Sequence, residues 1–313
     1  MMMGEMMNRI VHLAAISFAV IFGFSFMFSK VAMDYVTPIG LISYRFLVAF
    51  IVFELLRLCK VIHIRFQFRY IRSLLLVAIF QPVLYFLFEV YGLARTSSSE
   101  AGMMIALIPI FVSLLSTFIL KEKPKLVQVL FILMSVFGII YIQLMKSGSG
   151  IDFELVGFVL LFGAVISAAV FNITSRNASK VLKPYELTYF MMLIGAVVFN
   201  IIYLIDLIGE NRVEDYVLNL RHLELILPIL YLGVIASIGG FFLVNYALSH
   251  LEAHVASIYS NLATIVSIIA GAVFLGETLF YYHYLGSVLI IVGVYGTVRS
   301  NHRKRLKEEF DGT

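Results

Sequence analysis

Long apolar runs dominate the chain, and charged residues, proline and glycine interrupt them at nearly regular intervals. A helix that crosses a membrane needs about 20 consecutive, mainly apolar residues. Ten stretches of this kind lie between the interruptions. They cover residues 10–31, 37–59, 73–94, 98–120, 126–145, 154–175, 184–207, 223–248, 253–275 and 278–298. The pattern predicts an all-α, polytopic membrane protein with ten transmembrane helices joined by short loops.

The composition excludes most other classes of protein. Hydrophobic residues make up 61% of the 313 positions and charged residues 13%, whereas soluble domains average about 45–50% and about 25%. A soluble domain of this size could not cover so much apolar surface. Because ten spans use about 200 residues, no room remains for a soluble enzyme or a nucleic-acid-binding domain. We attribute the net charge of +4 to basic cytoplasmic loops, which hold the orientation of a membrane protein.

The distribution of Lys and Arg predicts the orientation. If the N-terminus lies inside the cell, 17 of the 23 Lys and Arg residues fall on the cytoplasmic side and five on the other, with Arg45 inside a span. Cytoplasmic loops are the ones that carry an excess of these residues. We therefore expect a multi-pass protein of the plasma (cell inner) membrane with both termini in the cytoplasm. Residues 299–313 are expected to form a basic cytoplasmic tail.

The two halves of the chain resemble each other. Polar residues, prolines and glycines recur at a shift of 155 residues in the later spans of each half and 146 in the earlier ones. The matched positions include Tyr91–Leu93 with Tyr246–Leu248, Glu122 with Glu277, Gly138 with Gly293, Lys30 with Arg176 and Pro38 with Pro184. We expect five-helix repeats at residues 10–145 and 154–298. Because five is odd, the repeats have opposite orientations in the membrane, as in many secondary transporters.

Motifs in both halves carry a family resemblance. They are Tyr44–Leu47, Tyr91–Ala101, Pro109–Phe111 and Leu120–Pro124 in the first half, and Tyr246–Leu248, Ser257–Leu262, Leu275–Thr278 and Leu285–Gly293 in the second. In this order they resemble the EamA-type transporters of the drug/metabolite transporter superfamily, with departures at Lys121 and Thr264. The resemblance implies two inverted five-helix EamA repeats and a central cavity lined mainly by spans one, three, four, six, eight and nine. It also implies transport of small metabolites, often outward.

Polar side chains inside the spans are the candidates for the cavity, because they are costly to place in lipid. Gln81, Tyr85 and Glu89 follow one another at intervals of four residues, so they share one face of the third span. The full set of candidates is Ser25, Gln81, Tyr85, Glu89, Met103, Asn172, Ser237, Phe241, Asn245 and Tyr259. The alternative role for the polar members is hydrogen bonding between helices.

Arg45 of the second span and Glu89 of the third are ionisable and fall in the half of the membrane predicted to face outward. We expect them to approach each other there, either as a gate that opens during transport or as a permanent ion pair. The alternative for Arg45 is to extend toward the outer headgroups. If transport is coupled to protons, Glu89 is the candidate carrier.

These patterns predict a secondary active transporter that exports a small organic metabolite (an amino acid or related solute, or a drug) by alternating access. The expected partners are this substrate, membrane lipid and the proton as candidate coupling ion; nucleic acid is excluded, and the expected assembly is a monomer or weak oligomer. No enzymatic activity, cofactor or metal is expected, because ATPase, hydrolase and metalloprotease motifs do not occur.

Two alternatives belong to other classes. A membrane-embedded enzyme or lipid-handling protein would need catalytic side chains gathered at one interface. A non-transporting receptor or scaffold would lack a polar stripe that faces the bundle.

Overall fold

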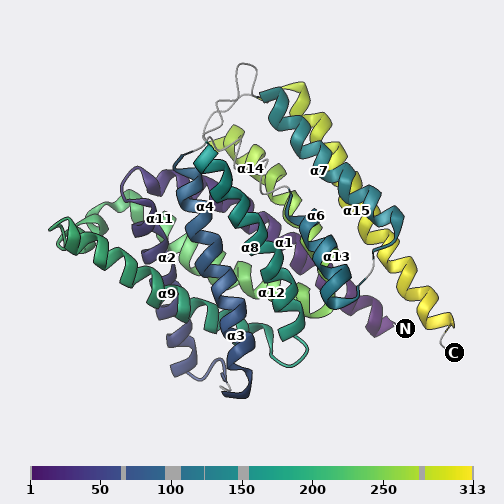
Figure 1. The fold of residues 1–313 in the computed structure, drawn as a ribbon, viewed down its shortest axis with the longest axis horizontal. Coiled ribbons are helices and arrows are strands. Elements are labelled where there is room, and N and C mark those ends of the chain that lie inside the picture. The colour runs from purple at the N-terminus through teal and green to yellow at the C-terminus, as the bar shows by residue number, and fades with distance from the viewer. Residues whose placement is uncertain are drawn as a thin grey trace.

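The computed structural model describes residues 2–64, 68–95, 107–122, 124–146, 155–274 and 279–311, and within them every regular element is helical. Figure 1 shows these helices gathered in one bundle. The elements are α1 (Met2–Met33), α2 (Pro38–Leu58), η1 (Phe68–Tyr70), α3 (Ile71–Ala78), η2 (Ile79–Leu84), α4 (Tyr85–Leu93), α6 (Ile108–Leu115), η3 (Ser116–Leu120), α7 (Leu126–Lys146), α8 (Leu155–Ala178), α9 (Pro184–Gly209), α10 (Asp215–Leu218), η4 (Asn219–Arg221), α11 (Leu223–Leu230), η5 (Tyr231–Gly240), α12 (Phe241–His250), α13 (Ala253–Ile258), α14 (Ser260–Phe274) and α15 (Tyr281–Asp311).

Eight of the described helical stretches are long and apolar enough to cross a membrane. They correspond to all predicted spans except the fourth and fifth. At those two places the described apolar helices, Ile108–Leu120 and Leu126–Gly138 within α7, are shorter. Residues 98–106 of the predicted fourth span lie outside the described residues. The all-α, multi-pass architecture is confirmed, and the count of ten spans stays a prediction.

The helix ends follow local chemistry where the chain offers it. Thr37 caps α2 by accepting a hydrogen bond from the backbone N–H of Gly40, and proline follows at the first helical position. The terminal helices are longer than predicted, since α1 begins at Met2 and α15 continues to Asp311. The predicted tail is thus helical as far as Asp311, because neither proline nor glycine interrupts residues 297–311.

The regular α-helical hydrogen bonding of the third and eighth spans is interrupted near their middles. In the third, η2 is a π-helical segment that contains Pro82, and Gln81 there has non-helical backbone angles. In the eighth, the π-helical segment η5 follows Pro228 of α11. Proline removes a backbone donor and clashes with the preceding turn, which breaks the regular helical hydrogen bonds. A shift of 155 places residues 79–84 on 234–239, inside η5, so the two breaks occupy equivalent positions.

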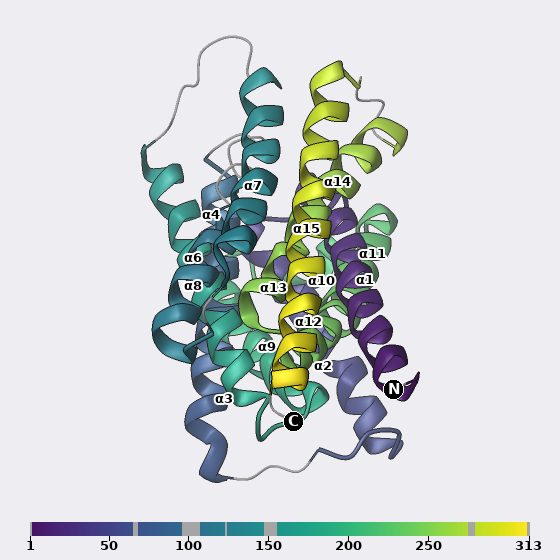
Figure 2. The ribbon, with the colours of Figure 1, turned by 90° about the vertical axis from the view of Figure 1, so that its right-hand side faces the viewer.

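The helix contacts also respect the repeat. Helix α2 packs on α9 and α7 packs on α15, so that equivalent helices of the two halves pair with each other. The contact of α1 with α12 and α14 is matched by the contact of α8 with α4 and α6. In Figures 1 and 2, α7 and α15 run side by side along one edge of the bundle.

Two glycines bring α7 and α15 into backbone contact. A β-carbon added to Gly138 would lie 2.8 Å from the carbonyl oxygen of Gly286, and one added to Gly293 would lie 2.7 Å from that of Phe131. The two contacts exchange under the shift of 155, because residues 131 and 138 map to 286 and 293. The relation between the two repeats therefore maps the α7–α15 pair onto itself.

Both termini lie toward the same end of the bundle, in the lower half of Figure 2. We call this the terminal end and the opposite one the far end. The turn between α8 and α9 and the junction of α12 with α13 belong to the terminal end, because successive spans alternate in direction. That the terminal end faces the cytoplasm remains a prediction from the charge distribution.

Candidate functional site

Arg45 lies in the interior of the bundle on α2, where its residue is 5% exposed. Its Nε donates a hydrogen bond of 2.8 Å to Ser237 Oγ in η5, the π-helical part of the eighth span. The guanidinium carbon lies 4.6 Å from the centre of the Phe86 ring on α4. A charged side chain at mid-membrane costs about 2.5–3.5 kcal/mol. A charge-assisted hydrogen bond contributes about 1.5–3 kcal/mol and a cation–π contact about 0.5–2 kcal/mol, so together they offset this cost.

Glu89 lies one turn beyond Phe86 on the same helix and faces Arg45. Tyr85 Oη donates a hydrogen bond of 3.2 Å to Glu89 Oε1. The charges of Arg45 and Glu89 interact, but within the described part of the chain no direct ion pair joins them. Both Tyr85 and Glu89 keep some exposed surface. The structure therefore brings the predicted pair into one neighbourhood inside the bundle.

Phe241 forms the aromatic wall beside this group. Its ring centre lies 5.4 Å from that of Phe22, 6.2 Å from that of Phe86 and 6.3 Å from that of Phe171. These rings come from α1, α4 and α8, three different spans, and Phe241 itself is buried. The predicted cavity residue thus packs in a closed aromatic cluster in this conformation.

The two predicted asparagines have different surroundings. Asn245 is buried, accepts a hydrogen bond from Ser175 Oγ at 2.7 Å and donates one to Thr188 Oγ1 at 3.0 Å. It therefore joins α12 to α8 and α9. Asn172 donates to the carbonyl oxygen of Ala168 in its own helix. Asn245 makes the interhelical hydrogen bonds that the sequence left as the alternative to a cavity role.

The remaining predicted residues are dispersed. Tyr259 is buried and its hydroxyl lies 2.6 Å from Nδ1 of His12 on α1, a contact that the sequence analysis missed. Ser25 donates to the carbonyl oxygen of Ile21 one turn earlier. Gln81 is buried at the break of the third span, where its non-helical backbone interrupts the helical spacing that was predicted to align it with Tyr85 and Glu89. Met103 lies outside the described residues.

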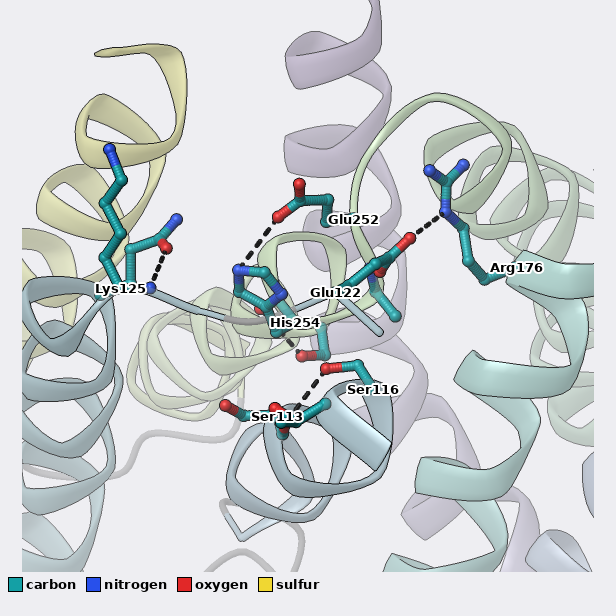
Figure 3. Close-up of polar contacts among 11 residues, drawn as sticks. Ser113, Ser116, Glu122, Lys125, Arg176, Glu252 and His254 are labelled. Carbon is teal, nitrogen blue, oxygen red and sulfur yellow. Dashed lines mark hydrogen bonds and ion pairs between the residues drawn. The ribbon is translucent and has the colours of Figure 1, made fainter. Parts of the chain in front are cut away.

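A second polar cluster lies at the terminal end and is drawn in Figure 3. Arg176 Nε of α8 donates to Glu122 Oε1 at 3.0 Å, just beyond η3. Arg176 Nη1 also donates to the carbonyl oxygens of Leu248 and Ser249 at 3.0 and 3.1 Å. Glu122 Oε2 accepts a hydrogen bond of 2.9 Å from the backbone N–H of Ala253. In the sequence both charged residues mark the repeat, and nothing there indicates that they pair.

A third cluster lies at the far end, where α10 folds back over α2 and α9. Asn200 Oδ1 accepts hydrogen bonds from Tyr216 Oη at 2.5 Å and from Ser43 Oγ at 2.7 Å. The rings of Tyr44, Tyr203 and Tyr216 surround this point, with centres 5.4 to 5.8 Å apart. Burial raises the pKa of Tyr216 above its ordinary value. The cluster fastens the loop between α9 and α11.

The same loop carries the acidic residues seen in the sequence. Arg212 pairs with Asp215 at 2.6 Å and with Glu210 at 3.2 Å. The hydrogen bond to Asp215, followed by its charge, raises the pKa of Arg212 above the ordinary value. Because the Arg212 side chain is 59% exposed, solvent weakens the pair, which contributes little to stability.

The described residues contain no group of three or more His, Cys, Asp or Glu side chains placed to hold a metal ion. The polar chemistry of the interior consists instead of small hydrogen-bonded groups between helices, some within one half, such as Asn245 with Ser175, and some across the two halves, such as Arg45 with Ser237. Two like halves with equivalent π-helical segments, joined through a buried arginine, define a polytopic membrane protein with the architecture of a repeat-built transporter.

Comparison with known proteins agrees with this class. The model of the EamA-like transporter family matches residues 9–144 and 155–299, so the chain belongs to this family. It is 38% identical over 289 residues to the "Uncharacterized transporter YcxC" of Bacillus subtilis (strain 168), covering 91% of this chain and 92% of the relative. The family is one of transporters rather than of enzymes, and the chain is an integral multi-pass membrane protein.

More distant matches extend the comparison. The chain is 26% identical over 188 residues to the "Probable amino-acid metabolite efflux pump" of Salmonella typhimurium, covering 59% of this chain and 62% of that protein. One solved crystal structure superposes with a TM-score of 0.72 at 16% identity, covering 92% of this chain and 97% of the other. At this identity the superposition supports the fold alone.

Proposed function

We propose that the protein is a secondary active transporter that exports a small organic metabolite, an amino acid or a related solute or drug, by alternating access. The observation that carries the proposal is the Arg45–Ser237 hydrogen bond, because it joins the two repeats at the π-helical segment of a spanning helix. Broken helices near the membrane midplane, at the interface of inverted repeats, are where such transporters bind their substrates.

The candidate substrate site is the group around this bond. It contains Arg45 and Ser237 together with Gln81, Tyr85 and Glu89. The Glu89 carboxylate is the candidate proton carrier, since it is an ionisable group inside the bundle, bonded to Tyr85 and close to Arg45. The name of the Salmonella relative supports both an amino-acid-like cargo and the outward direction. The proposed location is the plasma membrane, with both termini in the cytoplasm.

The test is transport by the purified protein in proteoliposomes. Radiolabelled amino acids that raise the apparent melting temperature are tested first, because a ligand that binds the folded state stabilises it. We expect transport by the wild type to respond to an imposed pH gradient and the Glu89→Gln variant to lose that response. Glu54→Gln is the matched control, because Glu54 pairs with Arg57 on the surface of α2.

Two results would contradict the proposal at different levels. If Glu89→Gln transports as well as the wild type at every pH, Glu89 is not the proton carrier. If no amino acid, related solute or drug stabilises the wild type or crosses the membrane with it, the transport function itself is wrong.

A further inference from the structure

The cluster drawn in Figure 3 joins the two repeats at the terminal end. Glu122 belongs to the first repeat and Arg176 to the second. Through their backbone partners the two side chains also hold the end of α12 and the start of α13. The fourth, sixth, eighth and ninth spans therefore meet at one ion pair. These are four of the six spans that the family resemblance assigns to the cavity wall.

Each member of the pair also satisfies a helix end. The guanidinium of Arg176 donates to carbonyl oxygens in the last turn of α12, where a positive charge is favoured. The carboxylate of Glu122 accepts the first N–H of α13, where a negative charge is favoured. The α12–α13 junction is thus held from both sides by side chains of other spans. When the pair separates, this junction is released.

The environment of the pair suits reversible opening. The Arg176 and Glu122 side chains are 18% and 15% exposed, so solvent screens their attraction only in part. Their position at the end of the bundle also lets water replace the hydrogen bonds when they part. The ion pairs Glu54–Arg57 and Arg212–Asp215 differ, because each pair lies within one helix or loop. Glu54 reaches the second repeat only through an uncharged donor, the Tyr189 hydroxyl.

We propose that the Glu122–Arg176 ion pair is an inter-repeat latch. It holds the terminal end closed and breaks each time the substrate site opens to that side. The inference rests on the proposed transport function, since it assigns part of the alternating-access cycle to two named residues. In the other half the counterpart of Arg176 is Lys30, which is exposed at the far end, and Glu277, the counterpart of Glu122, lies outside the described residues. At the far end the described contacts between the repeats are uncharged hydrogen bonds, such as that from Ser43 to Asn200, whereas the terminal end carries the ion pair.

The test measures access to each end of the protein in membrane vesicles with a membrane-impermeant maleimide. The natural thiol is removed by Cys59→Ser, because Cys59 is exposed at the terminal end. One reporter is Ser257→Cys, buried in α13 beyond the latch. The other is Lys30→Cys at the far end. Each reporter is combined in turn with Glu122→Gln, with Arg176→Gln and with the control Arg212→Gln.

The latch predicts changes of opposite sign. Glu122→Gln speeds labelling of the Ser257→Cys reporter from the terminal end about tenfold, the effect of losing one charge-assisted hydrogen bond. Arg176→Gln speeds it at least as much, because it also loses the bonds to Leu248 and Ser249. The same variants slow labelling of the Lys30→Cys reporter, because opening one end closes the other. Arg212→Gln changes neither rate.

A purely structural ion pair gives a different result. Its loss loosens the terminal end alone, so labelling at Lys30→Cys stays constant or rises, and this outcome overturns the latch. Unchanged labelling of the Ser257→Cys reporter overturns it as well. Because neither readout needs a substrate, the latch fails or stands separately from the transport assay in proteoliposomes, which tests the proposed function.

Discussion

Substitution of Gly293 by alanine tests whether backbone contact holds α7 against α15. The added β-carbon would lie 2.6 Å from Ser135 Cβ and 2.7 Å from the carbonyl oxygen of Phe131, whereas ordinary van der Waals contact begins at 3.4 Å. The second obstacle is backbone, so no rotamer change relieves it and the helices must separate. Helix association in a membrane depends on such close packing, because lipid removes the hydrophobic drive between helices.

The size of the effect follows from two opposing contributions. Overpacking a closely fitted interface costs about 1–3 kcal/mol. Alanine recovers about 0.5–1 kcal/mol of the backbone entropy that glycine loses within a helix. We therefore expect Gly293→Ala to lower the free energy of unfolding by about 0.5–2 kcal/mol. Gly138→Ala should have a similar effect, since its β-carbon meets the carbonyl oxygen of Gly286 at 2.8 Å.

The measurement is denaturant unfolding of the detergent-solubilised protein, followed by far-ultraviolet circular dichroism because the chain has no tryptophan. Gly209→Ala is the matched control, since nothing lies within 4 Å of the β-carbon added there. We expect the control to be as stable as the wild type or slightly more so. A Gly293→Ala variant of wild-type stability, or an equal loss in the control, would refute the close backbone contact.

Two further predictions concern the polar clusters. Asn245→Leu should lower the free energy of unfolding by about 1–3 kcal/mol, since it removes hydrogen bonds to α8 and α9. The control Asn172→Leu loses only a hydrogen bond within its own helix and should lower the free energy of unfolding less. Equal losses for the two variants in the same assay would contradict this prediction. Tyr216→Phe removes the hydrogen bond to Asn200. The free energy of local opening should fall by about 0.5–1.5 kcal/mol, and the amide hydrogen exchange of residues 208–222 should accelerate accordingly. Unchanged exchange measured by mass spectrometry would show that the far-end cluster does not fasten this loop.

The membrane itself makes much of this fold predictable from sequence. Lipid requires long apolar helices with internally satisfied backbones, so the spans stand out by length and hydropathy. The breaks in the third and eighth spans were not predicted, although Pro82 and Pro228 gave the signal for them. The extension of the last helix to Asp311 was also not predicted. The charged residues after position 298 mark where the helix leaves the membrane, but the helix itself continues beyond that point.

The candidate site was predictable only in part. Spacing placed Tyr85 and Glu89 on one helix face, and their hydrogen bond agrees with that. Spacing could not tell that Arg45 would bond to Ser237, 192 residues away in the chain. Partners across the bundle depend on how the two repeats pack, which periodicity within a single helix does not encode. For the same reason Glu122 and Arg176 gave no sign of being a pair.

The reciprocal contact between α7 and α15 has a mechanical consequence. Suppose that the two repeats exchange their conformations, as inverted repeats allow. The pair formed by Gly138 with Gly286 then becomes the pair formed by Gly293 with Phe131, so the interface as a whole is preserved. The Glu122–Arg176 pair instead maps to the opposite end of the molecule, where Lys30 lies. The α7–α15 edge can therefore stay fixed as a hinge line while contacts at the two ends alternate.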